Sequence, residues 1–306
     1  MSKKNSNLTA AKEAKNDEFY TRLEDIENEL RHYKEHFKDK VVLCPCDESE
    51  HTNFFKHFML NFEEYGMKKL ICIGYRTNRP AEVHIVERMG DGLMESNRIL
   101  MGNGDFRNVE TQYFFDEADV IVTNPPFSLF REFVDLLMKK NKKFLIIGNK
   151  NAITYKEIFP LIKENKIWLG CTSPSKFIQI EQDELKNMTG LTRWFTNLDI
   201  KKRKVVLDTG IEYECGLNRG WYQQYDNYDA INVNKVNQIP MDYDKPMGVP
   251  ITFLDKYNPD QFEILDANDY IIDGRAPKKS HGLIKDKDSS INSKPTYARI
   301  LIKKNI

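Results

Sequence analysis

Short runs of Val, Ile and Leu alternate with helical patterns through the first half of this 306-residue chain. The clearest runs are apolar on consecutive residues, namely Lys40–Cys46, Lys69–Gly74, Ala118–Thr123 and Lys143–Gly148. A continuous apolar run indicates a strand that is buried on both faces. Because helical patterns separate the runs, the sequence predicts an α/β fold with a doubly wound, mostly parallel sheet.

Helix and strand boundaries follow from the same periodicities. Apolar residues at helical spacing predict helices over Leu23–His36, around Phe54–Phe62 and over Phe130–Lys140. Arg98–Met101 is expected to begin a third strand, with Asp105 and Phe106 at its end.

The composition changes after about residue 170, where Asn, Asp, Tyr, Gly and Pro become common. The expected strands there are short, at Lys204–Leu207 and Tyr297–Lys303. We therefore predict a flexible basic arm over residues 1–16, an α/β domain over 17–170 and a less regular region over 171–306. The last strand is expected either to rejoin the core or to pair within the C-terminal region.

Charge and cysteine content exclude several classes of protein. Lys and Arg total 46, as do Asp and Glu, so the net charge is zero and gives no general argument for binding a polyanion. The five Cys residues include no C-x-x-C pair, which disfavours a disulfide scaffold and favours a reducing compartment. No apolar stretch is long enough to span a membrane. We expect a soluble cytoplasmic protein without a metal site, since the His and Cys residues lack ligand spacing.

The sharpest motif is Asn124-Pro125-Pro126-Phe127, between a strand and a helix. It therefore lies at the carboxyl end of a sheet strand, where open α/β folds bind ligands. A simple turn would explain one proline, because proline is favoured in the first turn of a helix. Two prolines followed by an aromatic residue fix an unusual rigid loop, and this favours a functional role.

The chemistry that suits this loop is transfer to a planar amino nitrogen. Such a nitrogen is a poor nucleophile because its lone pair is delocalised into the ring. The Asn124 amide oxygen and the Pro125 carbonyl can each accept one of its N–H bonds, which holds the amine and directs its lone pair. Phe127 can stack on an extruded base.

The motif and its surroundings resemble the EcoRI-type adenine-specific DNA methyltransferase family. The matching stretches include NDEFYTRLEDIENEL from Asn16, VVLCPCDE from Val41, GNGDFRN from Gly102, VTNPPFSLFREF from Val122, IGNKNAITY from Ile147, RWFTNLD from Arg193 and FLDKYNPDQFEIL from Phe253. The resemblance implies a Rossmann-like methyltransferase fold with a C-terminal target-recognition region. It also implies methyl transfer from S-adenosylmethionine to adenine N6 in duplex DNA, with base flipping, in restriction–modification or in phage or host DNA modification.

The resemblance also implies which residues border the cofactor. Phe19, Tyr20 and Thr21 would lie at its methionine end, although Thr21 also fits a helix-capping box. Cys44 and Pro45 stand where such enzymes usually carry a Gly-rich turn, which this chain lacks. Asp47 or Glu48 would pair with the cofactor ammonium group. Asp105 would accept from the amine of the cofactor's adenine, and Phe106 would pack on that ring. Asn124 is also expected among the cofactor contacts, and no ribose carboxylate is assigned.

Local basic clusters are the candidates for DNA contacts. They are Lys201, Lys202, Arg203 and Lys204, followed by Lys278 and Lys279. Trp194 and Phe195 lie close to the first cluster in sequence, but core burial is the favoured interpretation for both.

Two other functions stay open at this point. The same loop serves methyltransferases that act on RNA bases or on a protein glutamine, because each offers a planar amino nitrogen. A non-catalytic nucleic-acid-binding module is the second alternative, supported by the missing Gly-rich turn and ribose acid. The sequence leaves the oligomeric state open and is compatible with a monomer.

Overall fold

The computed structural model describes residues 19–47, 52–90, 92–179, 184–278 and 281–305, and the chain divides into two compact units. The first unit runs to Ala152 and resumes over Leu169–Leu198; the second comprises Ile153–Trp168 and the chain from Asp199 onward. The expected arm over residues 1–16 lies outside the described residues. The expected boundary at residue 170 separates a cofactor-binding domain from a target-recognition region. The two compact units are defined by contacts and not by function, so this boundary stays a prediction.

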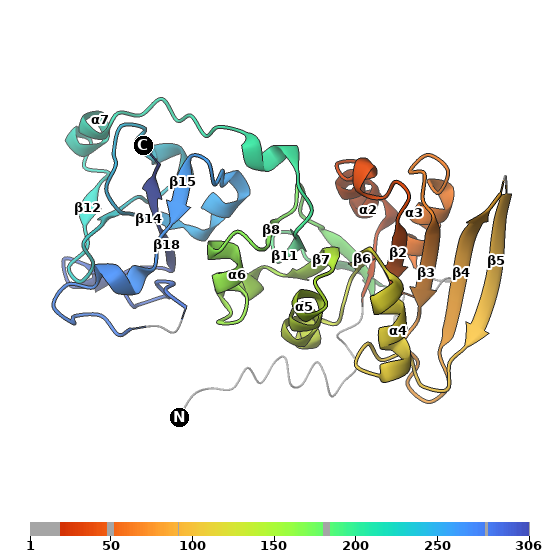
Figure 1. Ribbon diagram of the computed structural model, residues 1–306. Coiled ribbons are helices and arrows are strands. Elements are labelled where there is room, and N and C mark those ends of the chain that lie inside the picture. The colour runs from red at the N-terminus through yellow and green to blue at the C-terminus, as the bar shows by residue number, and fades with distance from the viewer. Residues whose placement is uncertain (1–18, 48–51, 91, 180–183, 279–280, 306) are drawn as a thin grey trace. The chain divides into compact units, whose positions relative to one another are not determined.

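A large twisted sheet forms the centre of the first unit, with the strand order β5-β4-β3-β2-β6-β7-β11-β8 (Figure 1). Its central strands are parallel: β3 (Lys69–Ile73), β2 (Val41–Cys44), β6 (Val120–Thr123) and β7 (Lys143–Asn149). All four apolar runs identified in the sequence form these strands. The mostly parallel core predicted from the sequence is therefore confirmed.

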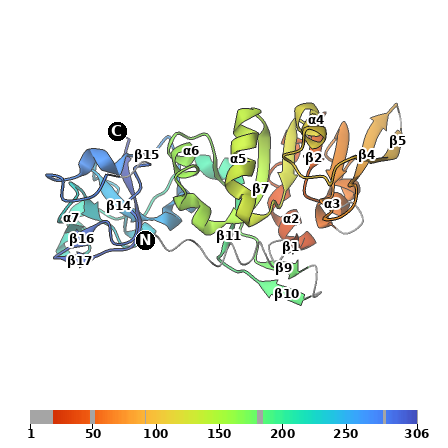
Figure 2. The same ribbon diagram turned by 90° about the horizontal axis from the view of Figure 1, so that it is seen from below.

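Helices cover both faces of this sheet. Helices α2 (Leu23–Leu30) and α3 (Asn53–Leu60) lie on one side, and α4 (Val109–Glu117) and α5 (Phe130–Lys139) lie on the other (Figures 1 and 2). Two consecutive residues of β11 (Thr192–Thr196), Trp194 and Phe195, pack on opposite faces of the sheet. The Trp194 ring contacts Phe54 of α3 with centroids 6.1 Å apart, whereas the Phe195 ring contacts Phe130 of α5 at 5.0 Å. Both side chains are fully buried, so their expected place in the core is confirmed.

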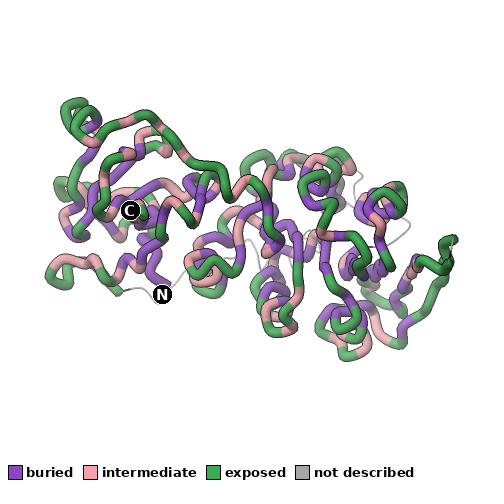
Figure 3. Tube along the Cα trace, turned by 45° about the horizontal axis from the view of Figure 1, so that its top comes forward, coloured by how far each residue is buried: buried purple, intermediate pink, exposed green. Residues whose placement is uncertain are grey.

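The edge beyond β3 differs from the expectation. Residues Glu82–Met89 (β4) and Gly92–Ile99 (β5) form a long antiparallel hairpin on β3. Arg98–Met101 therefore overlaps the end of β5 and does not begin a new strand, so that expectation was wrong. Every residue of β5 is exposed (Figure 3), which explains why its polar sequence gave no strand signal.

The first helix is also shorter than its apolar spacing suggested. Helix α2 ends at Leu30, and the chain turns before a 3-10 helix, η1 (Lys34–His36). The turn brings the Tyr33 hydroxyl to donate a hydrogen bond to Glu29 Oε1 at 2.7 Å. Glu29 is fully buried and also accepts from the backbone N–H groups of Cys171 and Thr172. This carboxylate therefore fixes the segment that follows β8 (Trp168–Leu169).

A small antiparallel sheet completes the first unit (Figure 2). It has the order β1-β9-β10, formed by Phe19–Thr21, Lys176–Gln179 and Glu184–Asn187. The 3-10 helices η2 (Phe127–Leu129) and η3 (Lys150–Thr154) follow β6 and β7.

The second unit is built on a sheet of short strands in the order β12-β13-β14-β18-β15. These strands are Gln223–Gln224, Ile231–Asn232, Met247–Pro250, Arg299–Lys304 and Phe262–Ile264. Its helical elements are α6 (Phe159–Lys163), η4 (Lys201–Lys204), α7 (Tyr213–Asn218), η5 (Val236–Gln238), η6 (Ile251–Lys256) and η7 (Ala267–Tyr270). The last strand, β18, pairs with β14 and β15. It thus pairs within the C-terminal region, which was one of the two expected outcomes.

No strand forms over Lys204–Leu207, contrary to the expectation from its valines. The basic residues form η4, and Val205 and Val206 are 62% and 66% exposed. The Gln261 side chain bonds both backbone groups of Leu207, accepting at 2.7 Å and donating at 2.6 Å. A side-chain amide therefore satisfies this backbone in place of a neighbouring strand. Within the part of the chain that the structure describes, no helix is long and apolar enough to cross a membrane.

The packing of α5 on β7 gives a test of this arrangement. A Cβ atom at Gly148 would lie 2.4 Å from Cε2 of Phe130. We expect Gly148→Ala to lower the free energy of unfolding by roughly 1–3 kcal/mol, because the added methyl group overpacks the interface. Urea unfolding measures the difference. Gly92→Ala is the matched control, since a Cβ there meets nothing within 4 Å; equal stability of the two variants would contradict the packing.

Candidate active site

The carboxyl ends of β2, β3 and β6 meet at one edge of the sheet, because these strands are parallel neighbours. Two hydrogen bonds of Asp47 tie them together. Its backbone N–H donates to the Ile73 carbonyl at 3.0 Å, and its Oδ2 accepts from the Thr123 hydroxyl at 2.6 Å. Asp47 follows β2, Ile73 ends β3 and Thr123 ends β6. One residue therefore links the ends of three central strands.

The Asp47 carboxyl group is unusual for an acidic residue because it is only 4% exposed. Burial raises its pKa to about 7, and the hydrogen bond from Thr123 opposes part of that rise. A buried carboxylate favours the binding of a positively charged group. Titratable groups perturbed by burial in this way are typical of functional sites.

The loop Asn124–Phe127 starts directly after Thr123 at this edge. Asn124 is half-buried and Pro125 is buried. The backbone N–H of Leu129 donates to the Pro126 carbonyl at 2.9 Å, which closes the turn into η2 and α5. The Pro125 carbonyl stands outside that hydrogen bond and next to Asn124. Phe127 is only 8% exposed, so little of its ring surface faces solvent in this structure.

The segment Gly102–Phe106 returns from the β4–β5 hairpin to the same edge. The Arg76 backbone N–H, after β3, donates to the Asn103 carbonyl at 2.9 Å. Gly104 has φ +79°, and a Cβ there would lie 2.7 Å from the Gly74 carbonyl oxygen. Only glycine allows both this backbone conformation and this approach. The expected place of Asp105 at the end of a third strand was therefore wrong, but the loop still brings it near the end of β3.

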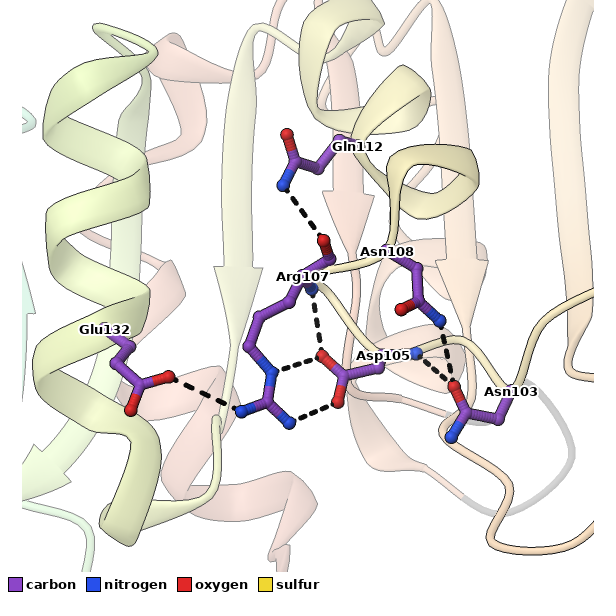
Figure 4. A network of polar contacts seen from close by, with 6 residues as sticks. All are labelled: Asn103, Asp105, Arg107, Asn108, Gln112 and Glu132. Carbon is purple, nitrogen blue, oxygen red and sulfur yellow. Dashed lines mark hydrogen bonds and ion pairs between the residues drawn. The ribbon is translucent and has the colours of Figure 1, made fainter.

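Asp105 is held by Arg107, as Figure 4 shows. The guanidinium donates from Nε to Oδ1 at 2.8 Å and from Nη2 to Oδ2 at 2.5 Å, and the Arg107 backbone N–H donates to Oδ1 at 2.9 Å. These hydrogen bonds lower the pKa of Asp105. A carboxylate has about four acceptor sites, so a further donor can still bind. The Arg107 guanidinium also lies 3.5 Å from Glu132 of α5.

Phe106 occupies a core position beside this network. It is 4% exposed, and its ring packs edge-on against Phe133 of α5 with centroids 5.0 Å apart. Its ring also lies 5.6 Å from the Arg107 guanidinium. Phe106 therefore anchors the Asp105 loop to the helix that follows the Asn124 motif.

Thr21 is the best-defined residue of the expected N-terminal cofactor segment. It is 2% exposed, and its hydroxyl has no hydrogen-bond partner among the described residues. Its carbonyl accepts from the Asn53 side chain at 2.7 Å, so the segment is attached to the start of α3. Phe19 and Tyr20 lie in the same strand, β1. An unsatisfied buried hydroxyl is costly and is a candidate for contact with a ligand.

The expected residues after β2 differ in what they can offer. Cys44 is fully buried, and burial raises the pKa of its thiol, so only its backbone suits a contact with a ligand. Pro45 is buried and lacks an N–H. Glu48 lies outside the described residues. In the ranges that the structure describes, no group of three His, Cys, Asp or Glu residues is arranged to hold a metal.

The residues of the densest basic cluster are largely engaged within the protein. The Arg203 guanidinium lies 4.1 Å from the Trp168 ring centroid and donates to Asn165 at 2.6 Å. Burial lowers the pKa of Arg203. Lys204 pairs with Asp199 at 2.8 Å, and Lys202 lies 3.9 Å from Asp255. Lys201 and Lys278 are exposed, and Lys279 lies outside the described residues.

Sequence reasoning missed Thr123, Asn53 and Arg107. Thr123 ends the strand before Asn124, and its side chain becomes important only because β2 and β6 are neighbours. Arg107 follows Asp105 by two residues in a glycine-containing turn, a spacing that favours a local ion pair. That spacing was the one signal the sequence offered.

The comparisons with known proteins cover nearly the whole chain. The model of a family described as adenine-specific methyltransferase EcoRI matches residues 7–305. Type II methyltransferase M.EcoRI of Escherichia coli is 45% identical, over 98% of this chain and 96% of that protein. Type II methyltransferase M.MgeORF184P of Mycoplasma genitalium is 37% identical, over 96% and 97%. Type II methyltransferase M.MpnI of Mycoplasma pneumoniae is 36% identical, over 96% of each chain.

The raised pKa of Asp47 predicts a pH-dependent stability. The folded-state pKa of about 7 exceeds the ordinary value of 3.8, so the folded state retains the proton longer. The protonated Asp47 carboxyl group therefore stabilises the folded state fully below about pH 4. The free energy of unfolding falls by about 4 kcal/mol in total as the pH rises from about 4 to about 7. Asp47→Asn removes the titration. We expect the free energy of unfolding of Asp47→Asn to exceed that of the wild type by an amount that grows between about pH 4 and about pH 7 and then stays constant.

Urea unfolding at several pH values measures this difference. Asp269→Asn, which changes an exposed carboxylate, serves as the control for the loss of one acidic group. A difference between Asp47→Asn and the wild type that does not vary with pH would mean that Asp47 is already ionised in the folded protein well below pH 7.

Proposed function

This chain belongs to the EcoRI family of adenine-specific methyltransferases, and on that premise we propose that Asn124, Pro125 and Phe127 form its catalytic loop. The enzyme is an adenine-specific DNA methyltransferase of the Type II restriction–modification class. The proposal extends this activity to individual residues, to S-adenosylmethionine as the methyl donor and to an adenine flipped out of duplex DNA.

The observation that carries the proposal is the attachment of the Asn124 loop to the shared strand edge. Thr123 is held by Asp47, and Leu129 closes the turn on the Pro126 carbonyl. Asn124 and Pro125 lie between these two fixed points. Their amide and carbonyl oxygens can therefore each accept one hydrogen bond from the amine of a target adenine. This positioning is most of what such a transfer requires from a protein.

The polar groups around the edge fit the parts of S-adenosylmethionine. The buried Asp47 carboxyl suits its ammonium group, and the unsatisfied Thr21 hydroxyl suits its methionine end. Asp105, whose pKa is lowered by Arg107, can still accept a hydrogen bond from the amine of the cofactor's own adenine ring. When bound, the cofactor supplies an electrophilic methyl group on a sulfonium. The backbone at Phe19, Tyr20, Cys44 and Pro45 and the packed ring of Phe106 would complete the walls of the site.

Phe127 is proposed to stack on the extruded base. Because its ring is 8% exposed here, stacking requires the loop to uncover one ring face. The two prolines restrict such a movement to the ends of the motif. Binding of DNA is therefore expected to change the loop more than the strand that precedes it.

Asn124→Ala should abolish most of the activity while leaving the other residues of the cofactor site in place. Loss of one preorganised hydrogen-bonding group at a reacting centre typically lowers kcat on the order of 10²–10³-fold. The assay digests mixed-sequence duplex DNA to nucleosides after incubation with S-adenosylmethionine and measures N6-methyladenine by mass spectrometry. Thermal stabilisation by S-adenosylmethionine should be retained, at about 2.7 kcal/mol when the ligand is at 100 times its Kd.

Asn97→Ala, on the exposed strand β5, is the matched control and should keep full activity. Full activity of Asn124→Ala would refute the proposed loop. Methylation of RNA or of a protein glutamine by the wild type, without any methylated adenine in DNA, would favour those substrates. Absence of stabilisation by the cofactor would favour a non-catalytic binding module.

The basic residues should divide into DNA contacts and structural residues. We expect the exposed Lys201→Gln and Lys278→Gln each to lower the slope of log Kd against log salt concentration by about 0.9, since each would lose one phosphate contact. Arg203→Gln should instead lower the unfolding temperature, because it loses its stacking on Trp168. Fluorescence anisotropy with duplex DNA and thermal unfolding separate the two effects. An unchanged slope for both lysine variants would exclude them from the DNA interface.

A further inference from the structure

A rigid β-hairpin projects exposed polar residues from the second unit. Strands β16 (Ser290–Ile291) and β17 (Lys294–Pro295) pair antiparallel, with Asn292 and Ser293 as the two-residue loop (Figure 2). Both loop residues have positive φ, at 48° and 62°. This is the geometry of a tight type I′ turn. All residues from Asn292 to Pro295 are exposed.

Asp226 holds the tip of this hairpin in one conformation. Its carboxylate accepts from the backbone N–H groups of Asn292 at 3.0 Å and Ser293 at 2.8 Å. It also accepts from the Ser290 hydroxyl at 2.9 Å, and these hydrogen bonds lower the pKa of Asp226. The Asn227 side chain bonds the backbone of Ser290 and Asp288 below the tip. The loop backbone is therefore engaged from within, and the side chains of Asn292 and Ser293 are left to face outward.

The base of the hairpin is attached to the core of the second unit. Ile291 packs against the buried cluster that contains Tyr225 and Tyr228. Asp226 and Asn227 lie between these two tyrosines in the chain. A ligand that meets the tip therefore meets a preorganised surface, and little ordering entropy opposes binding.

Exposed lysines around the hairpin are available to contact phosphates. Lys285, Lys287 and Lys294 are exposed. The neighbouring acidic residues bond to the protein backbone: Asp286 accepts from the Ala298 N–H at 2.6 Å, and Asp288 accepts from the Lys285 N–H at 3.1 Å. The carboxylates of Asp286 and Asp288 are thus engaged by the backbone of their own chain, which lowers their capacity to repel a phosphate. Pro295 lacks an N–H, which disfavours pairing of this edge with another strand.

We propose that the hairpin Ser290–Pro295 enters the major groove of duplex DNA, where Asn292 reads a base edge and Lys294 contacts a phosphate. A two-stranded ribbon fits the width of that groove, and an asparagine amide pairs in two places with adenine. The inference rests on the proposed function and adds a determinant of sequence specificity to it.

The decisive variant is Asn292→Gly. Glycine accepts the positive φ of this turn, so the hairpin keeps its conformation while the amide is removed. Methylation-sensitive sequencing of mixed-sequence DNA first defines the target of the wild type. The variant should lower kcat/KM on that target roughly 5- to 150-fold and relax the preference at one base position. Stabilisation by S-adenosylmethionine should stay unchanged.

Lys294→Gln tests the phosphate contact independently of methyl transfer. We expect weaker binding to all duplexes and a salt slope lower by about 1, measured by fluorescence anisotropy. Lys235→Gln, an exposed lysine elsewhere in the second unit, is the matched control.

The outcomes separate the two proposals. If the wild type methylates DNA but Asn292→Gly keeps the same target and a kcat/KM within twofold, the hairpin does not read bases. If the wild type forms no methylated adenine in DNA, the proposed function fails; an unchanged salt slope for Lys294→Gln then overturns the hairpin proposal as well.

Discussion

The hydrogen bond from Thr123 to Asp47 joins the ends of two neighbouring parallel strands, and the geometry of the site depends on it. Asp47 also bonds the end of β3 through its backbone. The carboxylate is buried, so its removal from water has to be offset by this bond and by whatever cation the site receives. The loop that begins at Asn124 is consequently positioned by the sheet itself, and not only by its own prolines. A site built on strand ends in this way is stiffer than one carried by long loops.

A second set of contacts attaches the flanking segments to that edge. Gly104 packs against Gly74, Arg107 clamps Asp105, and Phe106 enters the core beside Phe133. The antiparallel hairpin β4–β5 includes the residues at which a third strand was expected to begin, yet its return segment still reaches the end of β3. The site edge is formed by the ends of β2, β3 and β6. A hairpin can therefore bring Asp105 to this edge without a further strand ending there.

The sequence predicts the parallel strands and the position of the Asn124 loop because both depend on local patterns. Continuous apolar runs identify β2, β3, β6 and β7, and the paired prolines mark the turn after β6. The pairing of Asp47 with Thr123 cannot be read from the sequence, since it depends on which strands become neighbours. Stacking of Arg203 on Trp168 is likewise a long-range contact that a run of four basic residues conceals. The polar strand β5 and the two-residue strands β12 and β13 carry too little apolar periodicity to be recognised, whereas the apolar run of β18 was predicted.

The course of the chain between the two units has a consequence for exchanging parts among relatives. Residues 153–168 leave the first unit after β7 and belong to the second, where Lys163 pairs with Asp266 and Trp168 supports Arg203. If only the chain from Asp199 onward were grafted, Asp266 and Arg203 would come from one parent, whereas their partners Lys163 and Trp168 would come from the other. A hybrid that keeps its fold has to carry both segments from one parent, so the second unit is inherited as a discontinuous module.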